Sequence, residues 1–189
     1  KNFIKYLDKY YILTLGVKFS VNDILFLLRH AKTEIGFNDH DRKLTEKGIK
    51  EAEKISQYIL KKTNSYKIIS SSSKRTFQTS NILLQLSSIK QTTEIIEDLY
   101  LASDNEIRDI IFSQHIKNEN IICIAHNPGI HQLALSLVKK SSIDPKFEKI
   151  NHKYPTAALA VIKIKDGKWE NLYSNQNELV DFVTPKDLK

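Results

Sequence analysis

Two arginines and two histidines that could act on a phosphoryl group follow apolar runs of this sequence; they are Arg29, His30, Arg75 and His126. Apolar runs of this kind are typical of parallel strands buried on both faces, and ligands of open α/β sheets bind at the carboxyl ends of such strands. No acidic residue interrupts the set, and guanidinium groups bind phosphate oxygens in pairs. The four residues therefore predict a pocket for a phosphoryl group.

Each of these side chains has a role in the chemistry that the pocket predicts. Arg29 and Arg75 can each bind two equatorial oxygens of the phosphoryl group. His126 precedes an expected helix, whose free N–H groups favour an anion. One ring nitrogen of His30 can attack phosphorus while a hydrogen bond orients the other. The expected intermediate is a phosphohistidine, which water then hydrolyses.

Other chemistries do not fit the spacing of the residues. A cysteine-dependent phosphatase needs an arginine six positions after the cysteine, whereas Gly129 lies six positions after Cys123. The sequence contains no GxxxxGK or GxGxxG motif. Asp39, His40 and Asp41 could bind a metal ion, but we favour a solvated loop as their interpretation.

Strands and helices are expected to alternate along the chain, which indicates an α/β fold. The expected strands are residues 24–29, about 66–70, 93–97 and 120–125. The expected helices are residues 46 to about 62, 74 to about 86, 104–115 and 130–138. Near the C-terminus, Asp166-Gly167 is typical of a tight turn that joins residues 157–164 and 168–173 in a hairpin. The tail, residues 174–189, is expected to be irregular.

The composition is that of an ordinary soluble protein of 189 residues, of which 41% are hydrophobic and 27% charged. One domain is expected over residues 24–189, preceded by an N-terminal extension of unknown role, residues 1–23. The formal net charge is +7, but the lysines are dispersed and no nucleic-acid-binding pattern occurs. No segment is long enough to span a membrane. The single cysteine, Cys123, excludes an intramolecular disulfide. We therefore expect a cytoplasmic protein without nucleic-acid or membrane partners.

Six segments form an ordered set of motifs: residues 28–32 (LRHAK), 39–45 (DHDRKLT), 71–79 (SSSKRTFQT), 125–129 (AHNPG), 154–159 (YPTAAL) and 182–188 (FVTPKDL). In this order they resemble the histidine phosphatase superfamily, which has the phosphoglycerate mutase-like fold, and within it the short SixA-type phosphohistidine phosphatases. The resemblance covers residues 24–188. Two residues depart from the pattern, because Ala31 replaces a glycine and Lys43 replaces a proline.

The resemblance implies a three-layer α/β/α sandwich with a mostly parallel sheet, and neither a metal nor an organic cofactor. It implies that His30 is the nucleophile and that Arg29, Arg75 and His126 hold the phosphoryl group. Asn127, which follows His126 in the same motif, is expected to bind the substrate as well.

The general acid has three candidates. Larger members of the family use a glutamate in the region after the second arginine motif, where Glu97 and Glu106 lie in this chain. Asp39, on the loop after the nucleophile, is the third. Geometry must decide between them.

The expected function is that of a metal-independent phosphatase with a phosphohistidine intermediate, acting on a protein phosphohistidine as SixA-type enzymes do. Only residues 87–119 are available for a lid, so an open site is expected and a mutase is disfavoured. A phosphatase of a small phosphorylated metabolite, or a module that binds a phosphorylated ligand without turnover, are the alternatives. The sequence leaves the physiological substrate and the oligomeric state open.

Overall fold

The computed structural model describes residues 23–36, 38–88, 92–116, 119–140 and 143–189. In this part of the chain a six-stranded sheet is formed by β1 (Ile24–Arg29), β2 (Tyr66–Ser71), β3 (Thr93–Ile96), β4 (Asn120–Ala125), β5 (Leu159–Lys163) and β6 (Glu178–Val183). The strand order is β3-β2-β4-β1-β5-β6. β1 to β4 pair in parallel, whereas β5 is antiparallel to both of its neighbours. The expected extension, residues 1–23, lies outside the described residues apart from Asp23.

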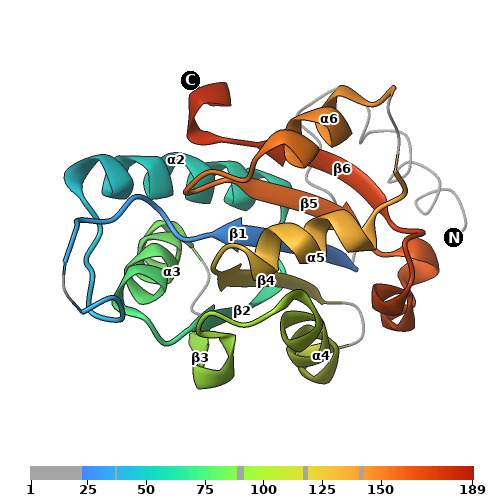
Figure 1. Ribbon diagram of the computed structural model, residues 1–189, viewed down its shortest axis with the longest axis horizontal. Helices are drawn as coiled ribbons and strands as arrows, with labels where there is room; N and C mark the ends of the chain where they lie inside the picture. Colours follow the sequence, from blue (N-terminus) through green and yellow to red (C-terminus); the bar gives the residue numbers. More distant parts are fainter. Residues whose placement is uncertain (1–22, 37, 89–91, 117–118, 141–142) are drawn as a thin grey trace, which may run out of the picture.

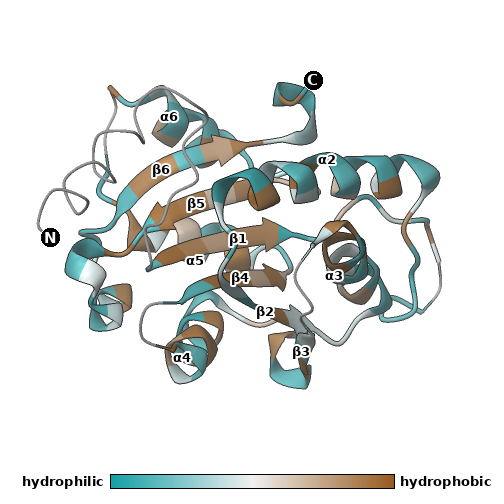
Figure 2. Ribbon diagram, turned by 180° about the vertical axis from the view of Figure 1, so that it is seen from behind, coloured by the Kyte–Doolittle hydropathy of each residue, from teal (hydrophilic) through white to brown (hydrophobic). Residues whose placement is uncertain are grey.

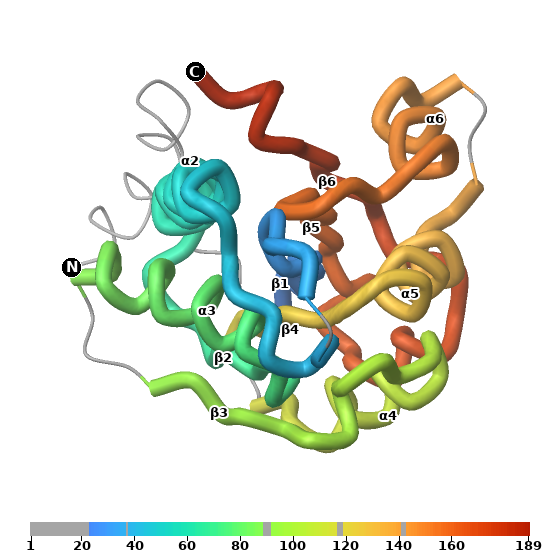
Figure 3. The backbone as a smooth tube through the Cα atoms, turned by 60° about the vertical axis from the view of Figure 1, so that its left-hand side comes forward, coloured from blue at the N-terminus to red at the C-terminus, as the bar shows by residue number. Residues whose placement is uncertain are grey.

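Helices cover both faces of the sheet. They are α2 (Glu46–Lys62), α3 (Lys74–Leu86), α4 (Asp104–Gln114), α5 (Gly129–Leu137) and α6 (Pro145–His152). α2 and α3 lie on one face and α4, α5 and α6 on the other, so that the molecule has three layers (Figure 1, Figure 3). The expected α/β/α sandwich with a mostly parallel sheet is confirmed. In the described part of the chain, no helix is both long enough and apolar enough to cross a membrane.

Side-chain caps fix where several of these helices begin. Side-chain oxygens of Thr45, Ser103 and Asp144 each accept a hydrogen bond from a first-turn N–H, in α2, α4 and α6 respectively. A cap of this kind stabilises a protein by about 1 kcal/mol.

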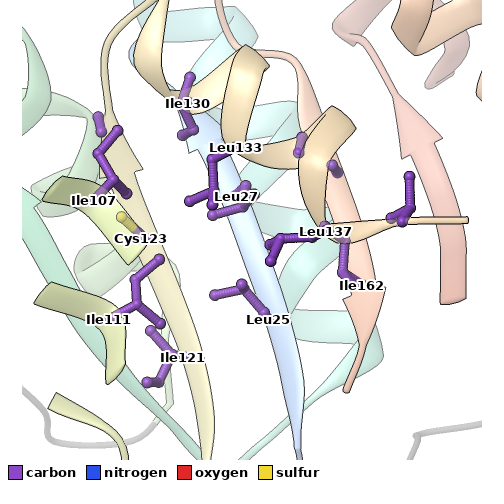
Figure 4. Close-up of a cluster of buried hydrophobic side chains, with 14 of the residues drawn as sticks. Leu25, Leu27, Ile107, Ile111, Ile121, Cys123, Ile130, Leu133, Leu137 and Ile162 are labelled. Atoms are coloured by element: carbon purple, nitrogen blue, oxygen red, sulfur yellow. The ribbon is translucent and has the colours of Figure 1, made fainter. Parts of the chain in front are cut away.

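The alternation of side chains along β1 divides the core into two clusters. Phe26 and Leu28 belong to the cluster under α2 and α3, whereas Leu25 and Leu27 belong to the one under α4 and α5. Figure 4 shows the second cluster, in which Cys123 lies among aliphatic side chains of the sheet and of helices α4 and α5. Cys123 is fully buried, as expected for a core residue. Figure 2 shows brown strands beneath helices with teal outer faces, which explains why the strand sequences are apolar runs.

The expected hairpin near the C-terminus is wrong. Asp166 and Gly167 do form a tight turn, with φ angles of 56° and 63°. The turn lies in the short 3₁₀ helix η3 (Lys165–Gly167) and leads to a second one, η4 (Trp169–Tyr173), instead of a strand. Trp169 is buried, and its Nε1–H donates to a carboxylate oxygen of Asp23 at 3.1 Å. Packing of this tryptophan therefore overrides the hairpin signal.

The expectation of an irregular tail is wrong as well, because β6 is the antiparallel partner of β5. A register shift between Val161 and Ile162 interrupts the simple alternation of this pair, which hides the strand from a search for periodicity. α6 was also missed, although Asp144 followed by Pro145 is a signal for the start of a helix. Two further 3₁₀ helices are η2 (Glu97–Leu99) and η5 (Pro185–Asp187).

Candidate active site

The carboxyl ends of the parallel strands bring the expected site residues to one edge of the sheet. Arg29 pairs with Ala125 across β1 and β4, and the backbone N–H of His30 donates to the carbonyl oxygen of Ala125 at 3.2 Å. His30 directly follows β1 and His126 directly follows β4, and the centroids of their rings lie 5.3 Å apart. Arg75 reaches the same pocket from the first turn of α3. The structure therefore brings the four predicted residues together.

His30 is held as a neutral ring in a single tautomer. The residue is only 7% exposed, and burial, together with Arg75 and Arg29, lowers the pKa of His30 to about 3. Its Nδ1 lies 2.8 Å from the carbonyl oxygen of Ala31. Because a carbonyl oxygen only accepts, Nδ1 carries the proton and donates it. Nε2 therefore keeps the lone pair that a nucleophile needs.

His126 is more deeply buried, with 2% of the residue exposed. Its Nε2 shares a hydrogen bond with Oγ of Ser71 at 2.8 Å. Burial, followed by His30 and Arg75, lowers the pKa of His126 to about 3. Its Nδ1 has no hydrogen-bond partner among the described residues, although it is buried. A buried polar atom in this state costs free energy unless a ligand or water binds it.

Arg29 is anchored by the loop before β5. Its Nη1 donates to the carbonyl oxygen of Tyr154 at 2.8 Å, and Nδ2 of Asn127 donates to the same oxygen at 3.0 Å. The Tyr154 hydroxyl donates in turn to the carbonyl oxygen of Leu27. Burial and then the charge of Arg75 lower the pKa of Arg29. Two guanidinium groups that repel each other in this way favour an anion between them.

Asp39 lies in the pocket as a hydrogen-bond acceptor. Its Oδ2 accepts from the Tyr100 hydroxyl and from Nη2 of Arg75, both at 2.8 Å, and its Oδ1 accepts from Nη1 of Arg42 at 3.0 Å. The bond from Tyr100, followed by those from Arg75 and Arg42, lowers the pKa of Asp39 to about 2. A carboxyl group in this arrangement is ionised at neutral pH. The expected role of Asp39 as proton donor does not fit this geometry. In it, the Asp39 carboxylate accepts a hydrogen bond from Arg75 and so orients the Arg75 side chain.

The motif over residues 71–79 holds the loop that follows His30. Oγ1 of Thr79 accepts from the N–H of Ala31 at 3.2 Å, and Oε1 of Gln78 accepts from the N–H of Leu44 at 2.8 Å. α3 therefore clamps both ends of that loop. Ala31 has no positive φ, so an alanine fits at the position where the resembling family has a glycine.

These residues face an open pocket of about 770 Å³ that also reaches α2, α6 and η5. Its three carboxylates belong to Asp39, Glu51 and Asp187. Asp39 is paired with two arginines and Asp187 with Lys149 of α6. Glu51 lies 3.9 Å from Lys47, and its buried Oε2 has no hydrogen-bond partner among the described residues. Against these three acidic residues, eight arginines and lysines line the pocket. The pocket is therefore strongly basic.

The other two candidates for the general acid do not line this pocket. Glu97 and Glu106 line a separate shallow depression on the other side of Leu101. The carboxylate of Glu106 accepts from the N–H and the hydroxyl of Ser103, as part of the cap of α4. Neither glutamate lies where it could protonate a leaving group in the pocket.

His40, on the same loop as Asp39, contacts Ser72 and Tyr100 at the edge of the site. Nε2 of His40 shares a hydrogen bond with Oγ of Ser72 at 3.0 Å, and its ring packs against the edge of Tyr100. Within the described ranges, no three histidine, cysteine, aspartate or glutamate side chains come close enough to hold a metal ion.

Two tyrosines of the site have no role in the sequence interpretation. Tyr154 belongs to a motif that carries the family resemblance, but only the structure shows that its carbonyl oxygen binds Arg29 and Asn127. Tyr100 lies in a segment without a motif. Its contact with Asp39 depends on the tertiary fold, and no local pattern signals it.

Comparison with known proteins agrees with this geometry. Residues 25–102, which include Arg29, His30 and Arg75, match the family model described as histidine phosphatase superfamily (branch 1). An uncharacterised protein of Mycobacterium leprae is 28% identical over 166 residues, which cover 84% of this chain and 100% of that protein.

Two solved structures show a similar fold. A protein of Nakamurella multipartitia that is assigned as the phosphohistidine phosphatase SixA aligns with a TM-score of 0.75 at 21% identity, over 87% of this chain and 97% of that one. The protein histidine phosphatase SixA in complex with tungstate aligns with a TM-score of 0.70 at 16% identity, over 88% and 99% of the two chains. Over residues 25–102 this chain thus matches the model of the histidine phosphatase superfamily, and its fold is similar to that of the solved SixA structures.

Proposed function

We propose that this chain is a metal-independent phosphohistidine phosphatase of the SixA type, in which His30 takes the phosphoryl group from a protein phosphohistidine. The observation that carries the proposal is that none of the three candidate acids is placed to donate a proton in the pocket, because Asp39 is an ionised acceptor and Glu97 and Glu106 do not line the pocket. An alkyl phosphate leaves as a poor alkoxide and needs a proton from the enzyme. A phosphohistidine ring that is protonated at its other nitrogen leaves as neutral imidazole and needs none.

In the first step, Arg29 and Arg75 hold the equatorial oxygens of the phosphoryl group, and His126 stabilises their charge. Nε2 of His30 forms a bond to phosphorus while the N–P bond of the substrate breaks. The electron pair of that bond stays with the leaving imidazole. The His30 ring becomes positively charged, and its Nδ1–H bond to the carbonyl oxygen of Ala31 stabilises this charge.

In the second step, water attacks the phosphoryl group on His30. The electron pair of the N–P bond returns to Nε2, which restores the neutral ring with its proton on Nδ1. The protons of the water go to the hydroxyl and the oxygens of the released phosphate. Because the His30 ring is already positively charged, it too can leave without a general acid.

Two further observations support this proposal. The arginines and His126 supply the positive charge and donors that a divalent ion supplies in metal-dependent phosphatases. The chain also shares its fold with SixA, which was solved as a complex with tungstate, a tetrahedral oxyanion.

Trapping of the intermediate tests the proposal. A peptide with a ³²P-labelled phosphohistidine is mixed with the wild-type protein and quenched in alkaline detergent. We expect a label on His30 that is stable to alkali and labile to acid. His30→Ala should carry no label and should not turn over. His152→Ala is the matched control, because His152 is exposed at the end of α6 and does not line the pocket; its turnover should equal that of the wild type.

Three results would contradict the proposal. One is label on a serine or an aspartate, and another is turnover that persists in His30→Ala. The third is a higher kcat/KM for an alkyl phosphate than for the phosphohistidine peptide, which would favour a small phosphorylated metabolite as the substrate.

A further inference from the structure

Three lysines that are far apart in the sequence meet at the mouth of the reaction pocket. Lys32 lies on the loop after β1, Lys153 follows the end of α6, and Lys186 lies in η5. All three are exposed. We call this set the lysine rim. The dispersed lysines of the sequence therefore become a local concentration of charge only in the fold.

With the exception of Arg29, the other basic residues of the pocket have a carboxylate partner, whereas the charge of the lysine rim is not compensated by a carboxylate. Arg42 and Arg75 pair with Asp39, Lys47 lies 3.9 Å from Glu51, and a lysine of α6 pairs with Asp187. Within the part of the chain that the structure describes, none of the three rim lysines forms an ion pair. Uncompensated cations beside a cleft attract anions from solution.

The pocket is also larger than the chemistry requires. One phosphoryl group is held by Arg29, Arg75 and His126, whereas the pocket measures about 770 Å³ and extends to α6 and η5. The lysine rim is therefore placed to contact those parts of a bound substrate that extend beyond the phosphoryl group of the substrate.

The opposite side of the mouth has the opposite charge. Leu101 separates the pocket from a shallow depression, and four acidic residues line that depression: Glu97, Asp98, Glu106 and Asp109. Leu101 itself is 57% exposed. An acidic ligand is thus attracted on the side of Lys153 and Lys186 and repelled beyond Leu101. The charges at the mouth therefore favour one orientation of such a ligand.

We propose that the lysine rim docks acidic side chains that flank the phosphohistidine of a protein substrate. This inference rests on the proposed function, whose substrate class it narrows. A small second phosphate group is bound best by buried donors with fixed geometry, as in the reaction centre. Exposed lysines beside an exposed leucine instead suit a protein surface, where charge complementarity gives specificity and fast association.

Binding of two matched peptides tests the proposal without turnover. Both carry the same non-hydrolysable phosphonate analogue of phosphohistidine; one has glutamates around it and the other has glutamines. We expect the wild type to bind the glutamate peptide about tenfold more tightly at low salt, which is about 1.4 kcal/mol. At about 0.5 M salt the difference should fall below about twofold, because exposed charges are screened.

Two double variants locate the effect. In Lys153→Gln/Lys186→Gln, the preference for the glutamate peptide should fall to about twofold or less. Lys163→Gln/Lys168→Gln removes the same charge at the amino edge of the sheet, where exposed lysines do not line the pocket. This control should keep the wild-type preference. Turnover of a generic aryl phosphate reports in parallel that both variants are folded.

The outcomes separate this inference from the proposed function. Equal binding of the two peptides by the wild type would overturn the docking role, even if phosphohistidine is hydrolysed. A preference that persists while no phosphohistidine peptide is hydrolysed would overturn the proposed function and leave the docking role in place. Tighter binding of a bisphosphorylated sugar than of the glutamate peptide, lost in Lys153→Gln/Lys186→Gln, would assign the rim to a small molecule instead.

Discussion

Asp39 holds both terminal nitrogens of Arg75: Nη2 donates to its carboxylate at 2.8 Å, and Nη1 donates to its backbone carbonyl oxygen. Arg75 is only 3% exposed, whereas the side chain of Asp39 is 46% exposed. One edge of a buried guanidinium group is thus fixed by a residue on the loop that follows His30. In the proposed mechanism, the position of the cation that faces the phosphoryl group therefore depends on that loop.

Asp39→Asn should lower kcat/KM by at least about tenfold, and by the same factor for an alkyl phosphate and for an activated aryl phosphate. The neutral amide keeps the shape of the side chain but weakens the bonds that orient Arg75. A general acid would have a different signature, because its loss hurts the alkyl substrate far more than the aryl one. Steady-state kinetics with both substrates distinguish the two roles.

Glu97→Gln and Glu106→Gln serve as controls for this experiment. Both glutamates line the depression beyond Leu101, so each variant should retain wild-type kcat/KM for these small substrates within about twofold. A loss in either variant that is confined to the alkyl phosphate would identify that glutamate as the acid.

Arg75→Lys should lower kcat/KM by at least about tenfold, which corresponds to about 1.4 kcal/mol of transition-state stabilisation. Lysine retains the charge but has no planar fork, so it cannot reproduce the two bonds to Asp39 while it also binds a phosphoryl group in a bidentate way. Lys74→Arg is a matched control in the same helical turn, because Lys74 is exposed and does not line the pocket. Unchanged kinetics in Arg75→Lys would exclude a bidentate role for this residue.

Activity should survive exhaustive treatment with EDTA, because Arg29 and Arg75 already supply the positive charge that the phosphoryl oxygens need, and His126 can add a hydrogen bond. The measurement compares the turnover of an aryl phosphate before chelation, after it, and after addition of Mg²⁺ or Zn²⁺. Loss of activity that either ion restores would contradict the proposed mechanism and point to metal binding near Asp39 and His40.

Local signals in the sequence were sufficient for the parts of the fold that place the catalytic groups. The apolar runs of β1 and β4 predict buried parallel strands, and parallel pairing in register makes His30 and His126 neighbours. The cap of α2 is likewise visible in the sequence as Thr45.

Features that depend on tertiary contacts could not be predicted from local patterns in the sequence. Burial of Trp169 replaces the expected hairpin, and the register shift in β5 hides β6. In the site, the spacing of residues placed Asp39 on the correct loop but could not show that Tyr100, 61 positions later, donates to its carboxylate. That bond is the largest cause of the lowered pKa of Asp39.

The stability of the protein should depend on pH through His30. An unfolded histidine binds a proton below about pH 6.5, whereas burial lowers the pKa of His30 in the folded state to about 3. Between these values the unfolded state binds more protons, so a fall in pH destabilises the folded state. From pH 7 to pH 5, this residue should remove up to about 2 kcal/mol from the free energy of unfolding.

Urea unfolding at pH 7 and pH 5 measures this effect as a difference between variants. Other groups titrate in the same range, so the loss in the wild type is compared with the loss in His30→Gln, which has no ring to protonate and should lose less. His152→Gln controls for the substitution itself, because His152 is exposed and does not line the pocket. Equal losses in the wild type and in His30→Gln would mean that His30 titrates near its usual pKa. It would then be largely protonated at pH 5, and the ¹⁵N shifts of its ring would report that directly.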